Sequence, residues 1–204
     1  MKNILLYLTL LTLTSLMATD TATLKEKCKT ADATACYEFA LPLTTGDNAK
    51  VQDIMEEGFS YMRKACVLGE EKACTQMGLI YYKDKSYHAA KPYLKKSCAN
   101  NEKRACEFMA VIYRDGHDTP ADDVKSREYF EKACTLKSAD SCFYVAIIYR
   151  GGFGVEKSRT KEKEFYQKSC DFGLKGGCER FTELDNEDKG IETGIMATIK
   201  NWFK

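Results

Sequence analysis

The sequence predicts an all-α protein in which pairs of helices stack into a solenoid and disulfides clamp the turns between them. Three observations predict this fold. Ten cysteines form five C-x7-C pairs at a near-fixed period, and two amphipathic patterns recur at helical spacing, one after each pair and one before it. Of the 204 residues, 44% are hydrophobic, which is enough for a core and excludes wholesale disorder.

The first element is an N-terminal segment that we expect to be removed from the mature protein. Lys2 precedes an uncharged, largely apolar run over residues 4–17, and Leu16 and Ala18 occupy the −3 and −1 positions of a cleavage site. This arrangement predicts a secretory signal peptide over residues 1–18. A membrane anchor is the alternative, but the run is shorter than the ~20 residues that span a bilayer. We therefore expect a secreted or periplasmic protein without a transmembrane span after cleavage.

The cysteines carry the strongest signal in the chain. The first cysteines of successive pairs lie 32 to 38 residues apart, which indicates an internal repeat. The pairs are Cys28 and Cys36, Cys66 and Cys74, Cys98 and Cys106, Cys134 and Cys142, and Cys170 and Cys178. Zinc motifs use shorter spacings and often histidine, so we expect no metal. An even cysteine count in a secreted chain favours disulfides, and pairing within each C-x7-C is the simplest connectivity, although spacing alone does not fix it.

Pairing within each C-x7-C requires a turn between the two cysteines. On one continuous helix, residues eight apart lie about 12 Å apart along the axis, whereas a disulfide needs Cα atoms within about 7 Å. The intervening segments contain turn-forming residues, such as Gly69, Asn101 and Gly173. Each pair is therefore predicted to clamp the turn from one helix to the next.

Two helices are predicted between successive clamps. After the second cysteine of a pair, an apolar residue at position 3, a small residue at position 4 and often a tyrosine at position 7 form one helical stripe. The small residues are Ala40, Gly78, Ala110 and Ala146. Before the first cysteine, aromatic or apolar residues at −5 and −4 and a lysine at −2 mark the second helix. We interpret both apolar stripes as core packing.

These patterns resemble a known family. The small residue in the first helix, the loop Tyr149–Val155 and the closing Lys-Ala/Ser-Cys are similar to Sel-one-like repeats, which are relatives of tetratricopeptide repeats. A C-x7-C pair in every unit resembles the Helicobacter cysteine-rich protein family in particular. The resemblance covers about residues 25–184. It implies a right-handed α-solenoid of disulfide-clamped helix pairs over residues 19–184, with about four pairs plus terminal helices, and it implies penicillin binding and weak β-lactam hydrolysis.

The segment 185–204 is predicted to cap the last repeat with a helix. Residues 185–190 are polar and are expected to form a loop before that helix. Apolar residues then recur at helical spacing at Ile191, Ile195, Ile199 and Trp202. A helix that docks on a partner or on a membrane surface is the alternative.

A binding groove is predicted on the concave face, which one helix of each pair lines in such solenoids. By analogy with the family, positions 1, 5 and 8 after the second cysteine face it. The predicted groove residues are Tyr82, Glu107, Arg114, Phe143 and Arg150. Arg114 and Arg150 occupy equivalent positions in consecutive repeats, where two guanidinium groups could hold a carboxylate. The alternative is a pair of solvated helix ends at which arginine complements the helix dipole.

Two classes of function fit these observations. The first is a binding module, expected to be a monomer without a cofactor, that holds a peptide, a peptidoglycan-type fragment or a protein partner. The formal net charge of +1 argues against nucleic acid. The second is a β-lactamase, as the resemblance implies. Its weak catalytic candidates are Ser158 and Lys161 in an S-x-x-K motif, which lacks its partner motifs and is expected about once by chance, and Ser158 equally suits a helix N-cap.

Overall fold

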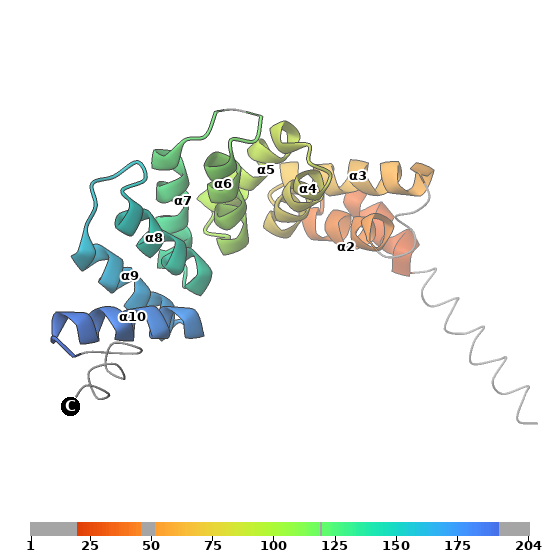
Figure 1. Cartoon of the computed structure of the whole chain (residues 1–204). Coiled ribbons are helices and arrows are strands. Elements are labelled where there is room, and N and C mark those ends of the chain that lie inside the picture. Colours follow the sequence, from red (N-terminus) through yellow and green to blue (C-terminus); the bar gives the residue numbers. More distant parts are fainter. Residues whose placement is uncertain (1–19, 46–51, 119, 192–204) are drawn as a thin grey trace, which may run out of the picture. The chain divides into compact units, whose positions relative to one another are not determined.

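The computed structural model describes residues 20–45, 52–118 and 120–191, which contain helices and no strand (Figure 1). A helical segment over residues 20–29 comes first. It is followed by α2 (Ala33–Thr44), α3 (Gln52–Val67), α4 (Glu71–Lys83), α5 (Tyr87–Ala99), α6 (Lys103–Asp115), α7 (Asp123–Thr135), α8 (Ala139–Gly151), α9 (Arg159–Asp171) and α10 (Lys175–Asp188). The predicted all-α class of clamped helix pairs is confirmed. The signal peptide and the helix predicted after Ile191 lie outside the described residues.

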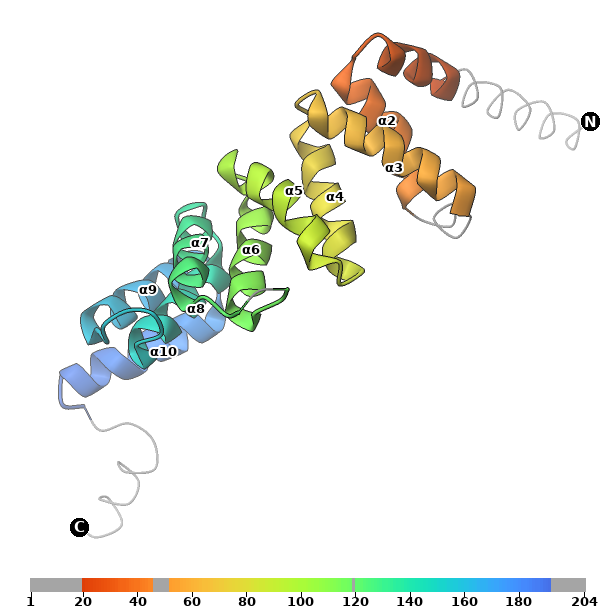
Figure 2. The same ribbon diagram turned by 90° about the horizontal axis from the view of Figure 1, so that it is seen from above.

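Contacts divide the described residues into two compact units, one that ends at Tyr93 and one that begins at Leu94. In the first unit α3 packs on α2 and α4, and in the second unit each helix from α6 to α9 packs on the next helix in the chain (Figure 2). Packing between neighbours along the sequence is the signature of a repeat protein. In the part of the chain that the structure describes, no helix is both long and apolar enough to cross a membrane.

All five C-x7-C pairs form disulfides within the pair, with Cα–Cα distances of 4.5 to 4.8 Å. The third residue after each first cysteine has a positive φ, between 64° and 104°, which reverses the chain inside the clamp. These residues are Ala31, Gly69, Asn101, Lys137 and Gly173. Because glycine takes this conformation without cost and other residues do not, the turns at Ala31 and Lys137 are held against a local preference. The predicted local pairing and clamped turns are confirmed.

The repeated aromatic residues pack between the helices of a pair. The tyrosine at position 7 of one helix stacks on the aromatic residue at −5 of the following helix. The stacked pairs are Tyr81–Tyr93, Tyr113–Tyr129 and Tyr149–Phe165, with ring centroids 5.6 to 5.7 Å apart. The small residues Ala40, Ala110 and Ala146 are fully buried beside them. Both stripes are therefore core, as predicted.

The lysine at −2 also has a structural role that the sequence pattern did not reveal. Lys64 Nζ donates to the carbonyl oxygen of Cys28 at 2.7 Å, and Lys132 Nζ donates to that of Ala99 at 3.4 Å. Both acceptors lie in the last turn of the helix one repeat earlier. A cation at this end complements the helix dipole and satisfies a terminal carbonyl, so Lys64 and Lys132 each tie their repeat to the preceding one, whereas Lys168 at the equivalent position pairs with Glu164.

The loop predicted at residues 185–190 is corrected, because α10 continues to Asp188. Side chains of α9 stabilise this polar last turn. Lys163 Nζ lies 3.0 Å from Asp185 Oδ1 and 2.7 Å from Asp188 Oδ2, and Arg159 Nε lies 3.0 Å from Asp188 Oδ1. A polar sequence is therefore helical where a neighbouring helix supplies the opposite charges.

We expect acid to loosen α10 from α9. Lys189 and Lys163 lower the pKa of Asp185, and Lys163 and Arg159 lower the pKa of Asp188. A carboxyl group with a lowered folded-state pKa stabilises the fold at a pH above its unfolded value, about 3.9, and loses that contribution as the pH falls through the folded value. Hydrogen exchange should show α10 amides losing protection below about pH 4. The Asp185→Asn/Asp188→Asn variant should show a smaller loss, and an equal loss would contradict the prediction.

Candidate ligand-binding sites

A largely apolar pocket of about 310 Å³ lies where α6, α7 and α8 meet. Its lining residues are Arg114, Asp123, Ser126, Phe130, Tyr144, Ile147, Ile148 and Phe153. Phe130 is buried and stacks on Tyr144, with ring centroids 5.0 Å apart. Tyr144 and Phe153 remain 40% and 50% exposed, respectively. The pocket therefore has a buried aromatic wall and two exposed aromatic rings.

Arg114 is the member of the predicted groove that lines this pocket. Its Nε and Nη2 atoms donate to Asp115 at 2.7 and 3.1 Å, and its guanidinium carbon lies 5.4 Å from the centroid of the Tyr144 ring. The hydrogen bonds from Arg114 lower the pKa of Asp115, and the same carboxylate raises the pKa of Arg114. Arg114 is thus held over the exposed tyrosine with its charge compensated by a neighbour.

Ser126 contributes a polar atom to the apolar pocket. Its side chain, on the first part of α7, is 2% exposed, and its Oγ has no hydrogen-bond partner. An unpaired buried hydroxyl costs free energy, which a ligand atom recovers when it bonds to that hydroxyl. The pocket therefore suits an apolar group with a polar tip.

The other predicted groove residues lie elsewhere. Phe143 packs on Tyr166 of α9 with ring centroids 5.1 Å apart, so it belongs to the core between α8 and α9. Arg150 is exposed in the last turn of α8, Glu107 is half-buried on α6, and Tyr82 lies in the first unit in an edge contact with Tyr87. A shared anion site of Arg114 and Arg150 stays a prediction.

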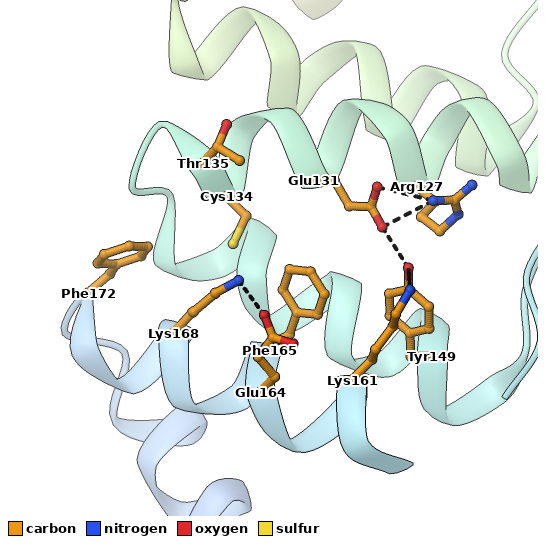
Figure 3. Close-up of a pocket in the computed structure, with 10 residues that line it drawn as sticks. All are labelled: Arg127, Glu131, Cys134, Thr135, Tyr149, Lys161, Glu164, Phe165, Lys168 and Phe172. Carbon is orange, nitrogen blue, oxygen red and sulfur yellow. Dashed lines mark hydrogen bonds and ion pairs between the residues drawn. The ribbon is translucent and has the colours of Figure 1, made fainter. Parts of the chain in front are cut away.

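A second pocket, of about 590 Å³, lies along α7, α8 and α9 (Figure 3). It is lined by Arg127, Glu131, Cys134, Thr135, Tyr149, Lys161, Glu164, Phe165, Lys168 and Phe172. The Tyr149 hydroxyl donates to Glu131 Oε1 at 3.0 Å and accepts from Lys161 Nζ at 3.2 Å. Arg127 Nη1 donates to both Glu131 oxygens at 3.1 Å. One hydrogen-bonded chain thus joins three helices across the pocket.

Of the two catalytic candidates from the sequence, Ser158 lies at the start of α9 and Lys161 lines this pocket. Ser158 is the N-cap of α9, and its Oγ accepts the Lys161 backbone N–H at 3.4 Å, which confirms the capping role. The Lys161 ammonium group instead donates to Tyr149. In the ranges that the structure describes, no cluster of three or more His, Cys, Asp or Glu side chains could hold a metal ion.

Several pocket residues had not been singled out as ligand contacts. Tyr144 follows Phe143, and one residue along a helix turns the side chain by about 100°, so the groove prediction was one position away from the exposed ring. Ser126 could have been found by aligning the repeats, because it occupies the position eight residues before the first cysteine of a pair. Ala90 holds that position in α5, and both side chains are buried. Glu131 carried no signal, because surface glutamates are common in such helices.

Comparisons with known proteins identify the family of the chain. The Sel1 repeat model matches residues 34–70, 103–138 and 139–173, together more than half of the chain. A sequence comparison with curated proteins finds no match.

The fold is also found in solved structures of other proteins. A protective antigen with an SLR fold from uropathogenic Escherichia coli has 18% identity and a TM-score of 0.64 over 82% of this chain and 36% of its own. A Sel1 repeat protein from Oxalobacter formigenes has 17% identity and a TM-score of 0.62 over 79% of this chain and 65% of its own. This chain thus spans less than two thirds of each. Helicobacter pylori cysteine rich protein B matches 78% of this chain and 95% of its own at 21% identity, with a TM-score of 0.38. On the evidence of its three matched repeats, the chain belongs to the Sel1 repeat family.

Proposed function

We propose that this Sel1 repeat protein is an extracytoplasmic binding scaffold that takes a protein or peptide side chain into the pocket of α6, α7 and α8. The observation that carries this proposal is the pair of exposed rings, Tyr144 and Phe153, at an apolar pocket beside Arg114. Tyrosine, phenylalanine and arginine are enriched at protein interfaces, and tyrosine and arginine are frequent in the residues that dominate binding energy. Five disulfides are typical of an oxidising compartment, which supports secretion.

The pocket suits one large side chain of the partner. Its volume, about 310 Å³, is at the lower end of the range for small-molecule sites. We expect an aromatic ring to enter beside Tyr144 and Ile147 and to direct a polar tip toward Ser126, whose hydroxyl is buried without a partner. Tyrosine is therefore the anchor residue that we expect in the partner. A peptidoglycan-type fragment is the alternative ligand, and it lacks such a ring.

The β-lactamase alternative is less well supported. The Ser158 hydroxyl caps α9, and the ammonium group of Lys161 donates to Tyr149, so neither group is arranged as a nucleophile and its base. If the oxidised protein hydrolyses a chromogenic cephalosporin, we expect slow turnover that Ser158→Ala does not change.

The proposed anchor is tested by selecting peptides from a displayed library on the oxidised protein. We expect the selected peptides to contain a tyrosine, and Phe153→Ser and Tyr144→Ser to weaken their binding at least about tenfold. Ser126→Ala should remove the preference for tyrosine over phenylalanine, because the hydroxyl partner is lost. Val67→Ser removes an apolar side chain that is 75% exposed in the first unit, and it serves as the control. Unchanged binding by both aromatic variants, or binding of muropeptides alone, would overturn the proposal.

A further inference from the structure

The second pocket contains one positive charge that no carboxylate compensates. Three cations and two carboxylates line it. Arg127 pairs with Glu131 at 3.1 Å, and Lys168 pairs with Glu164 at 2.6 Å. Lys161 has the Tyr149 phenol as its partner, and within the described part of the chain it forms no ion pair. The lining residues therefore carry a net charge of +1, and the uncompensated charge is that of Lys161.

The Lys161 ammonium group is held in place before any ligand arrives. Tyr149 is 4% exposed, and its ring stacks on Phe165 with an interplanar angle of 10°. Because the phenol gives its proton to Glu131, its oxygen accepts from Lys161, whose Nζ also lies 4.7 Å from the ring centroid. An ammonium group has three donors, so donors remain for a ligand. A fixed cation loses less conformational entropy on binding than a free lysine side chain does.

An apolar side chain lies one helical turn from this cation. Phe165 lines the same pocket and stacks on Tyr149, the residue that holds Lys161, whereas Phe172 lies at the opposite end of the pocket in Figure 3. A ligand that fits both features carries a negative charge next to an apolar group. A single charge matches the pocket, because a doubly charged phosphate would place its second charge near Glu131 and Glu164 without a partner.

We infer that this pocket is a binding site for a carboxylate attached to an apolar group, as in the C-terminal residue of a peptide or in a free acylated amino acid. Lys161 binds the carboxylate, Tyr149 positions Lys161, and Phe165 contacts the apolar side chain. The site is separate from the pocket of Tyr144 and Phe153, and it does not depend on the function proposed for that pocket.

The test uses a fluorescein-labelled peptide that ends in phenylalanine, the same peptide with a C-terminal amide, and N-acetylphenylalanine as a competitor. Fluorescence anisotropy should show at least about tenfold weaker binding of the amide, and of the free acid to Lys161→Met, because a charge-assisted hydrogen bond is lost. Lys161→Arg should retain binding. Lys175→Met, which removes an equal charge from a side chain that is 91% exposed on α10, should bind like the wild type.

Two further results distinguish a free acid from a peptide C-terminus as the ligand, and this pocket from the pocket of Tyr144 and Phe153. Competition by N-acetylphenylalanine as strong as that of the unlabelled peptide identifies a free acid as sufficient, whereas weak competition identifies a peptide C-terminus, and both support the carboxylate site. Tyr144→Ser should leave this binding unchanged, so that failure here is distinguishable from failure of the tyrosine pocket. Equal binding of acid and amide, or unchanged binding by Lys161→Met, would overturn the inference.

Discussion

Reduction of the oxidised protein should lower its melting temperature by at least about 10 °C. Each disulfide closes a loop of about nine residues, which is worth roughly 2–3 kcal/mol by the chain-entropy estimate. Five such contributions do not add fully, but several kcal/mol in a chain of this size correspond to a shift of this order.

Thermal unfolding followed by circular dichroism, with and without a phosphine reductant, measures this shift. The Cys134→Ser/Cys142→Ser variant lacks one disulfide, so its melting temperature should be lower than that of the wild type before reduction. The reductant should lower it further, because four disulfides remain. Thiol labelling supplies the control. The native protein should have no reactive thiol, and the reduced, denatured protein should have ten. Several reactive thiols in the native protein, or a melting temperature that the reductant leaves unchanged, would contradict the prediction.

The repeat period made most of the fold predictable. The helices of every repeat pack in the same way. Other repeats therefore have counterparts of Ala146, Tyr149 and the disulfide at Cys142, and these recurring positions identify the core. The polar turn at Asp185 was not predictable in the same way. Its helical state depends on Lys163 and Arg159 of another helix, and a local pattern of polar residues carries no information about these partners.

The sites were less predictable than the fold because they depend on differences between repeats. Tyr149 was correctly assigned to the core, yet its hydroxyl also joins Lys161 to Glu131. Lys161 was singled out for its spacing from Ser158, whereas the cap at the start of α9 uses the Ser158 hydroxyl. Arg114 was found from its helical position, but its orientation over Tyr144 results from the adjacent Asp115 and from the packing of α6 near α8.

Phe130→Ala should destabilise the protein by about 3–5 kcal/mol, the range for removing a buried phenylalanine. Phe130 is 2% exposed and belongs to a core cluster with Ala110 of α6 and Val145 and Tyr149 of α8. A single side chain of α7 therefore connects the helices before and after it. Its removal leaves a cavity between three helices whose backbones the neighbouring disulfides restrain, so the site has little freedom to collapse.

Phe153→Ala is the matched control for this substitution, because the same side chain is removed from the same pocket at a position that is 50% exposed. Its effect on the free energy of unfolding should stay within about 0.5 kcal/mol. Denaturant titration followed by circular dichroism measures both variants, and hydrogen exchange should locate the loss of protection from Phe130→Ala in α6, α7 and α8. If Phe130→Ala costs no more than Phe153→Ala, the cluster around Phe130 is not what joins these helices. If Phe153→Ala keeps its stability but loses the selected peptide, the exposed ring acts in recognition and the buried one in the fold.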